Sequence, residues 1–123
     1  MSDLSAFLDY GFAEEMRRDF LKRKIKVKEL TNQKEMAGWT NVTGFVKNCW
    51  SCKYIEPSEL KIEFEFIIYN DTYAMYSFKE NKFWGMEIVS KEISSMQKQM
   101  FMFLWNKAQE IKVLNLNGKS AIL

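Results

Sequence analysis

Cys49 and Cys52 form a Cys-x-x-Cys pair, the spacing that redox and zinc chemistry both use. A redox pair needs its first thiol at a helix N-terminus, where the helix dipole stabilises the thiolate. Here we expect the pair to follow a helix and precede a strand, which is the wrong end. A zinc site needs four ligands, and the chain has no other cysteine and no histidine. Two copies could pool their pairs, but nothing else supports this alternative, and we interpret both cysteines as structural.

The segment 17–28 is rich in lysine and arginine, with Asp19 as its one acid. Such a segment could bind an anion or contact nucleic acid directly, which is the alternative function that we keep. It could also be a solvated helix face, partly neutralised by Glu14, Glu15 and Glu29, and the lack of interleaved aromatic residues favours this interpretation. An anion site stays open, and its candidate residues lie on or beside two early strands: Arg23, Lys26, Lys28 and Lys53.

Glu63 and Glu65 lie two residues apart in an expected strand, so their side chains should be neighbours on one face. Paired carboxylates can perform acid–base catalysis when the surroundings keep one of them protonated. Lys61 lies beside them and an antiparallel strand is expected opposite, so we predict cross-strand ion pairs instead.

The absence of histidine excludes Ser-His-Asp and Cys-His catalysis and removes the usual base near neutral pH. Carboxylate or lysine catalysis remains possible, but the sequence favours a protein that is not an enzyme and needs no cofactor or metal. The net charge of +2 does not by itself indicate a polyanionic partner. No apolar run approaches the ~20 residues needed to span a bilayer, and no signal peptide is recognisable, so we expect a cytoplasmic protein with no membrane partner.

The stretch from Ser58 to Trp105 predicts the elements on which any site would be built. Alternating residues predict a strand over 60–69, and Asn70-Asp71 a tight turn. TYAMYSF and FWGMEIVS predict two more strands, joined by a polar turn at KENK. A helix is expected over Lys91–Ile111, with one apolar stripe towards the sheet. That stripe is formed by Ile93, Met96, Met100, Leu104 and Ala108.

The rest of the chain predicts alternating helices and strands. We expect a helix over 3–24 with its stripe on Phe12, Met16 and Phe20, and Gly11 as a weak point. A strand over 25–30 and a second over 52–57 should flank a helix over 33–49, capped at Thr31-Asn32 and irregular around 39–44. The fold class is therefore α/β, with α+β as the alternative: a mixed sheet with a C-terminal antiparallel meander packed by helices. Residues 1–123 should form one domain, with 112–123 as a tail.

The last helix is more apolar than one sheet face requires. Its centre, Met100 to Trp105, is apolar on all sides, and the surplus must be buried elsewhere. We therefore predict a subunit or domain interface and a homodimer. The interface candidates are Met100, Phe101, Phe103 and Trp105.

Four segments together resemble a family: IKVKELTN, CKYIEP, FEFIIYNDTYAMYSF and GMEIVSKEISSMQKQMFMFLWNKA. The whole pattern, from about Phe20 to Lys107, resembles the C-terminal regulatory region of TrmB-like transcriptional regulators. The resemblance implies a phospholipase D-like fold, or half to most of one, together with dimerisation and sensing of a small-molecule effector. It also implies that DNA is bound only indirectly, through a separate helix-turn-helix domain, which is not recognisable in this chain.

The departures from the related catalytic motif matter more than the match. Phospholipase D-type catalysis uses His-x-Lys-x-x-x-x-Asp, and the resemblance places Ile62, Phe64 and Tyr69 at these three positions. The histidine would be the covalent nucleophile, so we expect no phosphodiesterase activity. The resemblance thus implies a non-catalytic regulatory domain.

Overall fold

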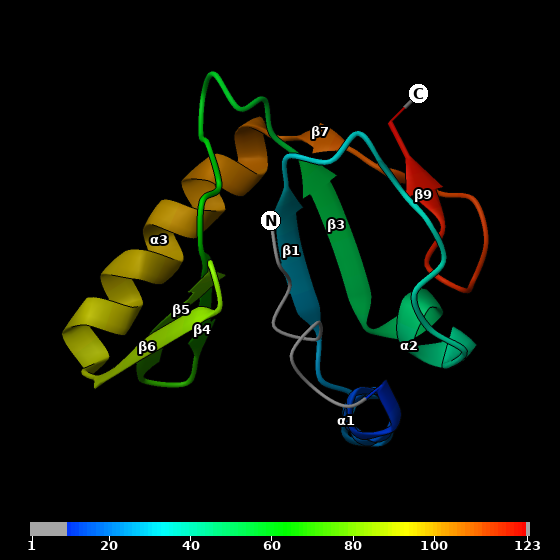
Figure 1. Ribbon diagram of the computed structural model, residues 1–123, viewed down its shortest axis with the longest axis horizontal. Helices are drawn as coiled ribbons and strands as arrows, with labels where there is room; N and C mark the ends of the chain where they lie inside the picture. The colour runs from blue at the N-terminus through cyan, green and yellow to red at the C-terminus, as the bar shows by residue number, and fades with distance from the viewer. Residues whose placement is uncertain (1–9, 123) are drawn as a thin grey trace. The chain divides into compact units, whose positions relative to one another are not determined.

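A computed structural model describes residues 10–122, which fall into two compact units of mixed helix and strand (Figure 1). The helix–meander unit is formed by Ile62–Lys107, and the two-sheet unit by residues 10–61 together with 108–122. Several small sheets accompany the helices, so the architecture is α+β, the alternative fold class of the two that the sequence predicts. The prediction of one domain over 1–123 stays a prediction.

The two-sheet unit contains two helices and six strands. In chain order they are α1 (Tyr10–Arg23), β1 (Val27–Thr31), β2 (Glu35–Met36), α2 (Thr43–Asn48), β3 (Trp50–Tyr54), β7 (Gln109–Glu110), β8 (Lys112–Val113) and β9 (Ser120–Ala121). One sheet has the order β1-β3-β7, with β1 parallel and β7 antiparallel to β3. The other is a small antiparallel sheet, β2-β9-β8.

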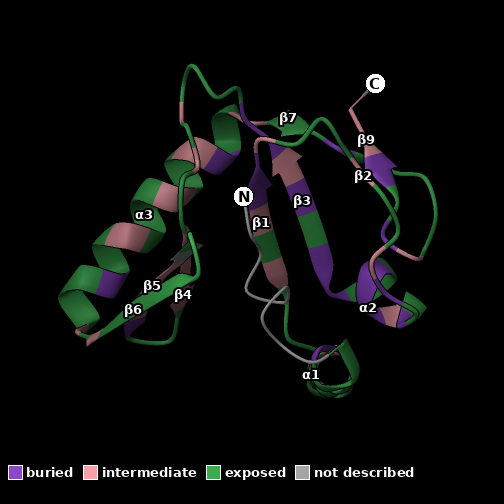
Figure 2. Ribbon diagram, in the orientation of Figure 1, coloured by how far each residue is buried: buried purple, intermediate pink, exposed green. Residues whose placement is uncertain are grey.

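The hydrophobic core of this unit gathers around α2 and β3 (Figure 2). Alternate residues of β3, Trp50, Cys52 and Tyr54, are buried, as expected for a strand with one face in the core. The ring of Phe45 in α2 lies 6.3 Å from that of Phe20 and 6.0 Å from that of Trp39. Core packing therefore joins both helices to the first sheet.

The helix predicted over 33–49 is wrong except for its last turns, because α2 spans only Thr43–Asn48. Thr31 ends β1 instead of capping a helix, and its hydroxyl accepts a hydrogen bond from the backbone N–H of Gln33. The segment before α2 is held by the carbonyl of Asn117, which accepts hydrogen bonds from the N–H groups of Trp39 and Thr40. The residues of this segment are weak helix formers, so hydrogen bonds from distant parts of the chain decide its conformation.

Residues 112–123 were expected to be a tail, and this prediction is wrong for the described residues. Lys112–Val113 and Ser120–Ala121 form β8 and β9, and β9 also pairs with β2. The turn between them has Gly118 with φ of +96°, in the left-handed region that favours glycine.

Replacing Gly118 by alanine should destabilise the protein by about 1–3 kcal/mol. A Cβ atom would lie 2.2 Å from the Trp39 Nε1 atom, and alanine is strained at this φ. Thermal unfolding followed by circular dichroism measures the loss. The exposed neighbour variant Lys119→Ala is the control, and an unchanged melting temperature for Gly118→Ala would contradict the prediction.

The helix–meander unit confirms the three predicted adjacent strands. It contains β4 (Glu65–Tyr69), β5 (Thr72–Lys79), β6 (Lys82–Val89) and α3 (Lys91–Lys107). In the second turn Glu80 and Asn81 have φ of +53° and +61°, the two positive values that a type I′ hairpin turn requires, whereas in the first turn only Asn70 is positive, at +50°, as in a type II′ turn. Two boundaries differ from prediction: residues 60–64 precede the strand, and α3 ends at Lys107 because β7 begins two residues later.

The faces of both long helices differ from the predicted ones. On α3, Ile93, Met96 and Met100 are exposed although they were expected against the sheet, and the buried residues are Ser94 and Trp105. On α1, Phe12 and Met16 are exposed, Phe20 packs against the core, and Gly11 lies within the helix. The part of the first predicted helix before Tyr10 lies outside the described residues.

Candidate functional site

The outward face of α3 carries large apolar side chains in contact with solvent. The exposed fraction is 57% for Met96, 52% for Met100 and 62% for Phe103, and Ile93 is exposed as well. Met96, Met100 and Phe103, with Gln99 and Leu104, line a shallow groove along the helix. Exposed apolar residues that gather on one element mark an interaction surface more often than single ones do. Two predicted interface residues, Met100 and Phe103, lie on this face.

The other two predicted interface residues lie elsewhere on the helix. Trp105 is buried, with 8% of its surface exposed, and its ring stacks on that of Phe101 at 5.9 Å. Phe101 is half-buried. A side chain that is already covered gains little from a further contact, so Trp105 offers little surface to a partner, and its interface role stays a prediction. The prediction missed Ile93 and Met96, which it had assigned to the sheet.

The candidate anion residues lie in the two-sheet unit, and most have protein partners. Lys28 and Lys53 project from the same face of β1 and β3, because Lys28 is in register with Ser51. Lys53 forms an ion pair with Glu110 at 3.5 Å, and Lys26 donates a hydrogen bond to the Asn48 carbonyl. Arg23 pairs with Asp19 at 3.1 Å. Whether these residues bind an anion stays a prediction.

Arg17, the first residue of the basic segment, is turned into the protein. Its guanidinium donates to the Glu14 carboxylate and to the Trp39 carbonyl, and it lies 4.8 Å from the centre of the Trp39 ring. Only 11% of its side-chain surface is exposed. Arg17 is therefore unsuited to contact nucleic acid, whereas Arg18 and Lys22 are exposed.

The cysteine pair follows a helix, as the sequence predicts, but its second member lies within the strand rather than before it. Cys49 follows the last turn of α2, and Cys52 lies in β3. Both thiols are free and buried. Burial, and secondly the nearby Glu29 carboxylate, raises the pKa of the Cys52 thiol well above its usual range. Because the thiolate is the nucleophile, this environment disfavours redox chemistry.

Both cysteines should react slowly with a thiol reagent such as Ellman's reagent. Only 4% and 6% of their surfaces are exposed, so we expect native-state rates at least about a hundredfold below that of free cysteine. The same reagent should modify both thiols promptly in denaturant, which is the internal control. Fast modification of the native protein would contradict a structural role.

Glu63 and Glu65 do not form the predicted pair on one strand face. Glu63 precedes β4, whereas Glu65 begins it, in register with Tyr76. The alternation of apolar and charged residues over 60–66 predicted a strand that starts earlier than the hydrogen-bonded strand β4 does. The two carboxylates therefore do not share a strand, and their role stays a prediction.

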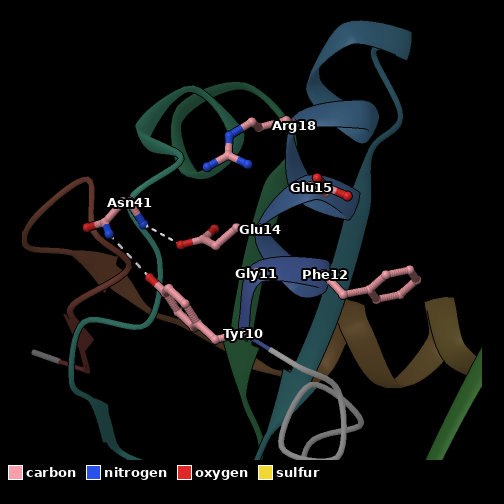
Figure 3. A pocket seen from close by; sticks show the side chains of 7 residues that line it. All are labelled: Tyr10, Gly11, Phe12, Glu14, Glu15, Arg18 and Asn41. Atoms are coloured by element: carbon pink, nitrogen blue, oxygen red, sulfur yellow. Dashed lines mark hydrogen bonds between the residues drawn. The ribbon is translucent and has the colours of Figure 1, made fainter.

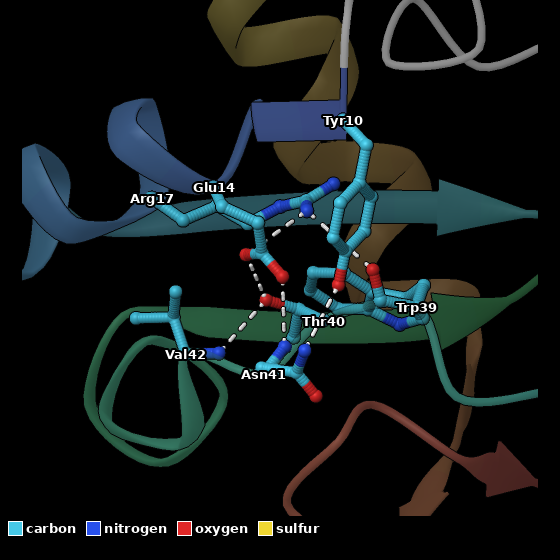
Figure 4. A network of polar contacts seen from close by, with 7 residues as sticks. All are labelled: Tyr10, Glu14, Arg17, Trp39, Thr40, Asn41 and Val42. Atoms are coloured by element: carbon cyan, nitrogen blue, oxygen red, sulfur yellow. Dashed lines mark hydrogen bonds and ion pairs between the residues drawn. The ribbon is translucent and has the colours of Figure 1, made fainter. Parts of the chain in front are cut away.

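The buried polar centre of the two-sheet unit is Glu14, which the sequence analysis treated only as a neutralising neighbour (Figure 4). Glu14 is 3% exposed. It accepts hydrogen bonds from the Thr40 hydroxyl at 2.5 Å, the Asn41 backbone N–H at 2.8 Å and Arg17 at 3.3 Å. These bonds tie α1 to the loop before α2. The signal in the sequence was the spacing of Glu14, Arg17 and Leu21 on one helix face.

Opposing effects set the pKa of Glu14. Burial by itself raises it, because a carboxylate loses its hydration. Hydrogen bonds from Thr40, Tyr10, Asn41 and Arg17 outweigh burial and lower the pKa from 4.5 to about 2. Glu14 is therefore ionised at neutral pH and cannot act as a proton donor there.

A pocket of about 550 Å³ opens beside this network, at the beginning of α1 (Figure 3). Its lining includes Tyr10, Glu14, Arg18 and Asn41. The Asn41 side chain donates to the Tyr10 hydroxyl, while its backbone N–H binds Glu14. The one buried charge in the lining is thus already satisfied by protein donors, which indicates a structural role for these contacts.

Comparisons of the chain with protein families, curated proteins and solved structures found no match. Among the described residues, none of the helices has both the length and the apolar character needed to cross a membrane.

Proposed function

We propose that this chain is a non-catalytic regulatory domain of a TrmB-like transcriptional regulator, acting in the cytoplasm by effector sensing, dimerisation or both. The observation that carries the proposal is the apolar outer face of α3, formed by Ile93, Met96, Met100 and Phe103. A domain that associates with another copy covers such a surface. DNA would be contacted through a separate helix-turn-helix.

Two further observations support the proposal. The hairpin at Tyr69-Asn70-Asp71, the strand containing Gly85 and the helix that begins at Lys91 follow the order that the resemblance implies. The chain also has no histidine, so phospholipase D-type chemistry lacks its nucleophile. The proposal includes a phospholipase D-like arrangement of the helices and strands of this chain.

An anionic effector would be recognised by Arg23, Lys26, Lys28 and Lys53. Lys28 is the best placed, because it is exposed and shares a sheet face with Lys53. A thermal-shift screen with sugars, sugar phosphates and nucleotides tests this role, since a ligand that prefers the native state raises the melting temperature. The shift from an anionic ligand should shrink in Lys28→Ala and persist in the control Lys112→Ala. A screen without any shift would leave dimerisation as the only role.

Self-association is tested by sedimentation equilibrium of the full chain over a range of concentrations. We expect a monomer–dimer equilibrium, because the outer face of α3 is too apolar to favour exposure to water. A protein that stays monomeric at high micromolar concentration would remove dimerisation from the proposed function.

A further inference from the structure

The exposed apolar residues of α3 have the spacing of a coiled-coil seam. Ile93, Met96, Met100 and Phe103 follow one another at steps of three, four and three residues, which are the a and d positions of a heptad. Lys107 continues the series, and its ammonium lies 4.5 Å from the centre of the Phe103 ring. The buried Ser94 and Trp105 lie on another face of the helix. The helix therefore has one face for its own unit and a second for another helix.

The groove on this seam has the composition of a coiled-coil hole. Met96, Gln99, Met100 and Phe103 line it, and they occupy positions i, i+3, i+4 and i+7. Four residues at these positions form the hole that receives one side chain, the knob, from a facing helix. The groove on α3 therefore fits a facing helix whose apolar side chains are also spaced three and four residues apart.

The charges on α3 indicate that the facing helix is a second copy of α3 and that the two helices run antiparallel. Glu92 lies at the N-terminal end of the seam and Lys107 at its C-terminal end. In an antiparallel pair of identical helices, each Glu92 approaches the partner's Lys107, and the helix dipoles oppose one another. In a parallel pair, each Glu92 would lie at the same end as the partner's Glu92, and each Lys107 at the same end as the partner's Lys107, whereas Lys91 lies at an f position, away from the seam. Gln97 and Gln99 flank the centre and are uncharged, and Lys98 between them donates a hydrogen bond to the Asn70 carbonyl of its own unit.

We propose that α3 pairs antiparallel with α3 of a second copy about a two-fold axis near Lys98. Ile93 then faces the partner's Phe103, and Met96 faces the partner's Met100. Each Met96 enters the hole described above on the other helix. This inference rests on the proposed function and specifies its dimer surface.

Substitution of one seam residue should abolish pairing without unfolding the chain. Met100→Glu places a charge of the same sign on both helices at the centre, and we expect the dimer dissociation constant to rise at least about a hundredfold. The matched control is Met102→Glu, because Met102 is exposed on the same helix but lies outside the seam. Circular dichroism should show both variants folded, because both side chains are exposed.

Disulfide cross-linking tests the direction of the pair. Gln99→Cys and Glu92→Cys lie at equivalent heptad positions, and the native thiols are buried. In the antiparallel pair the two copies of residue 99 are displaced by about 3 Å along the axis, but those of residue 92 by about 18 Å. We expect efficient cross-linking only at residue 99.

Three outcomes would overturn the inference. A dimer without cross-linking at residue 99 would mean another direction of pairing, because in a parallel pair this g position faces the partner's e position, and a dimer that survives Met100→Glu would mean a different dimer surface. Both would leave the proposed dimerisation intact. A wild-type chain that is monomeric at high micromolar concentration would contradict both the pairing of α3 and the proposed dimerisation. This result is expected if a helix of another protein covers this face instead.

Discussion

Replacing Glu14 by glutamine is expected to lower the free energy of unfolding by about 3 kcal/mol at pH 7. The folded-state pKa of about 2 lies below the ordinary value of 4.5, and each unit of difference corresponds to about 1.4 kcal/mol. Glutamine retains the shape of the side chain but loses the charge that attracts Arg17 and the Thr40 hydroxyl. Urea unfolding followed by tryptophan fluorescence measures the loss.

The pH dependence of this effect has a definite sign. A carboxyl group whose pKa is lower in the folded state stabilises the protein fully above its unfolded-state pKa. The stabilisation by Glu14 should therefore be complete above pH 4.5 and fall as the pH decreases towards 2. The difference between wild type and Glu14→Gln should shrink over this window. A difference of the same size at pH 2 and pH 7 would contradict the account, and the exposed neighbour variant Glu15→Gln is the control.

Replacing Phe45 by alanine is expected to cost about 3–5 kcal/mol. Its side chain is 5% exposed and lies between the rings of Phe20 and Trp39, so truncation leaves a cavity at the junction of α1, α2 and the loop before α2. The same unfolding measurement applies.

The control for this prediction is Phe12→Ala. Phe12 is the same residue type but is 55% exposed, and it should change stability by about 0.5 kcal/mol or less. Equal losses in the two variants would mean that the packing around Phe45 does not dominate the stability of the two-sheet unit.

The strands and turns of the helix–meander unit could be predicted from local sequence. Ile67, Tyr73 and Ile88 lie in runs of β-branched and aromatic residues, and Asn70 and Asn81 tolerate the positive φ of tight hairpin turns. Neighbouring strands joined by two-residue turns pair with little loop-closure cost. The helix from Lys91 was predictable for the same reason, because its hydrogen bonds are all local.

The region from Gln33 to Val42 could not be predicted in this way. Its backbone is held by Asn117 and Glu14, which lie far from it in the sequence. Such distant partners outweigh the small differences in helix propensity among the residues of this segment. The strands β7, β8 and β9 are also too short to show a period of two.

The exposed face of α3 could be predicted only in part. Two of its four interface residues, Met100 and Phe103, lie on the exposed face, whereas Trp105 is buried. The apolar composition of α3 indicated that it has more than one packing face. It did not indicate which residues belong to which face, because two apolar stripes overlap on one helix.

By itself, the sequence determined the absence of histidine chemistry, the three-stranded meander and the helix that follows it, because residue types and local hydrogen bonding decide these features. Only the tertiary structure decided that Glu14 is buried, that Lys112–Val113 and Ser120–Ala121 join a sheet, and that Met96 faces solvent. Burial is a property of contacts between segments that are distant along the chain, and no local pattern specifies those contacts.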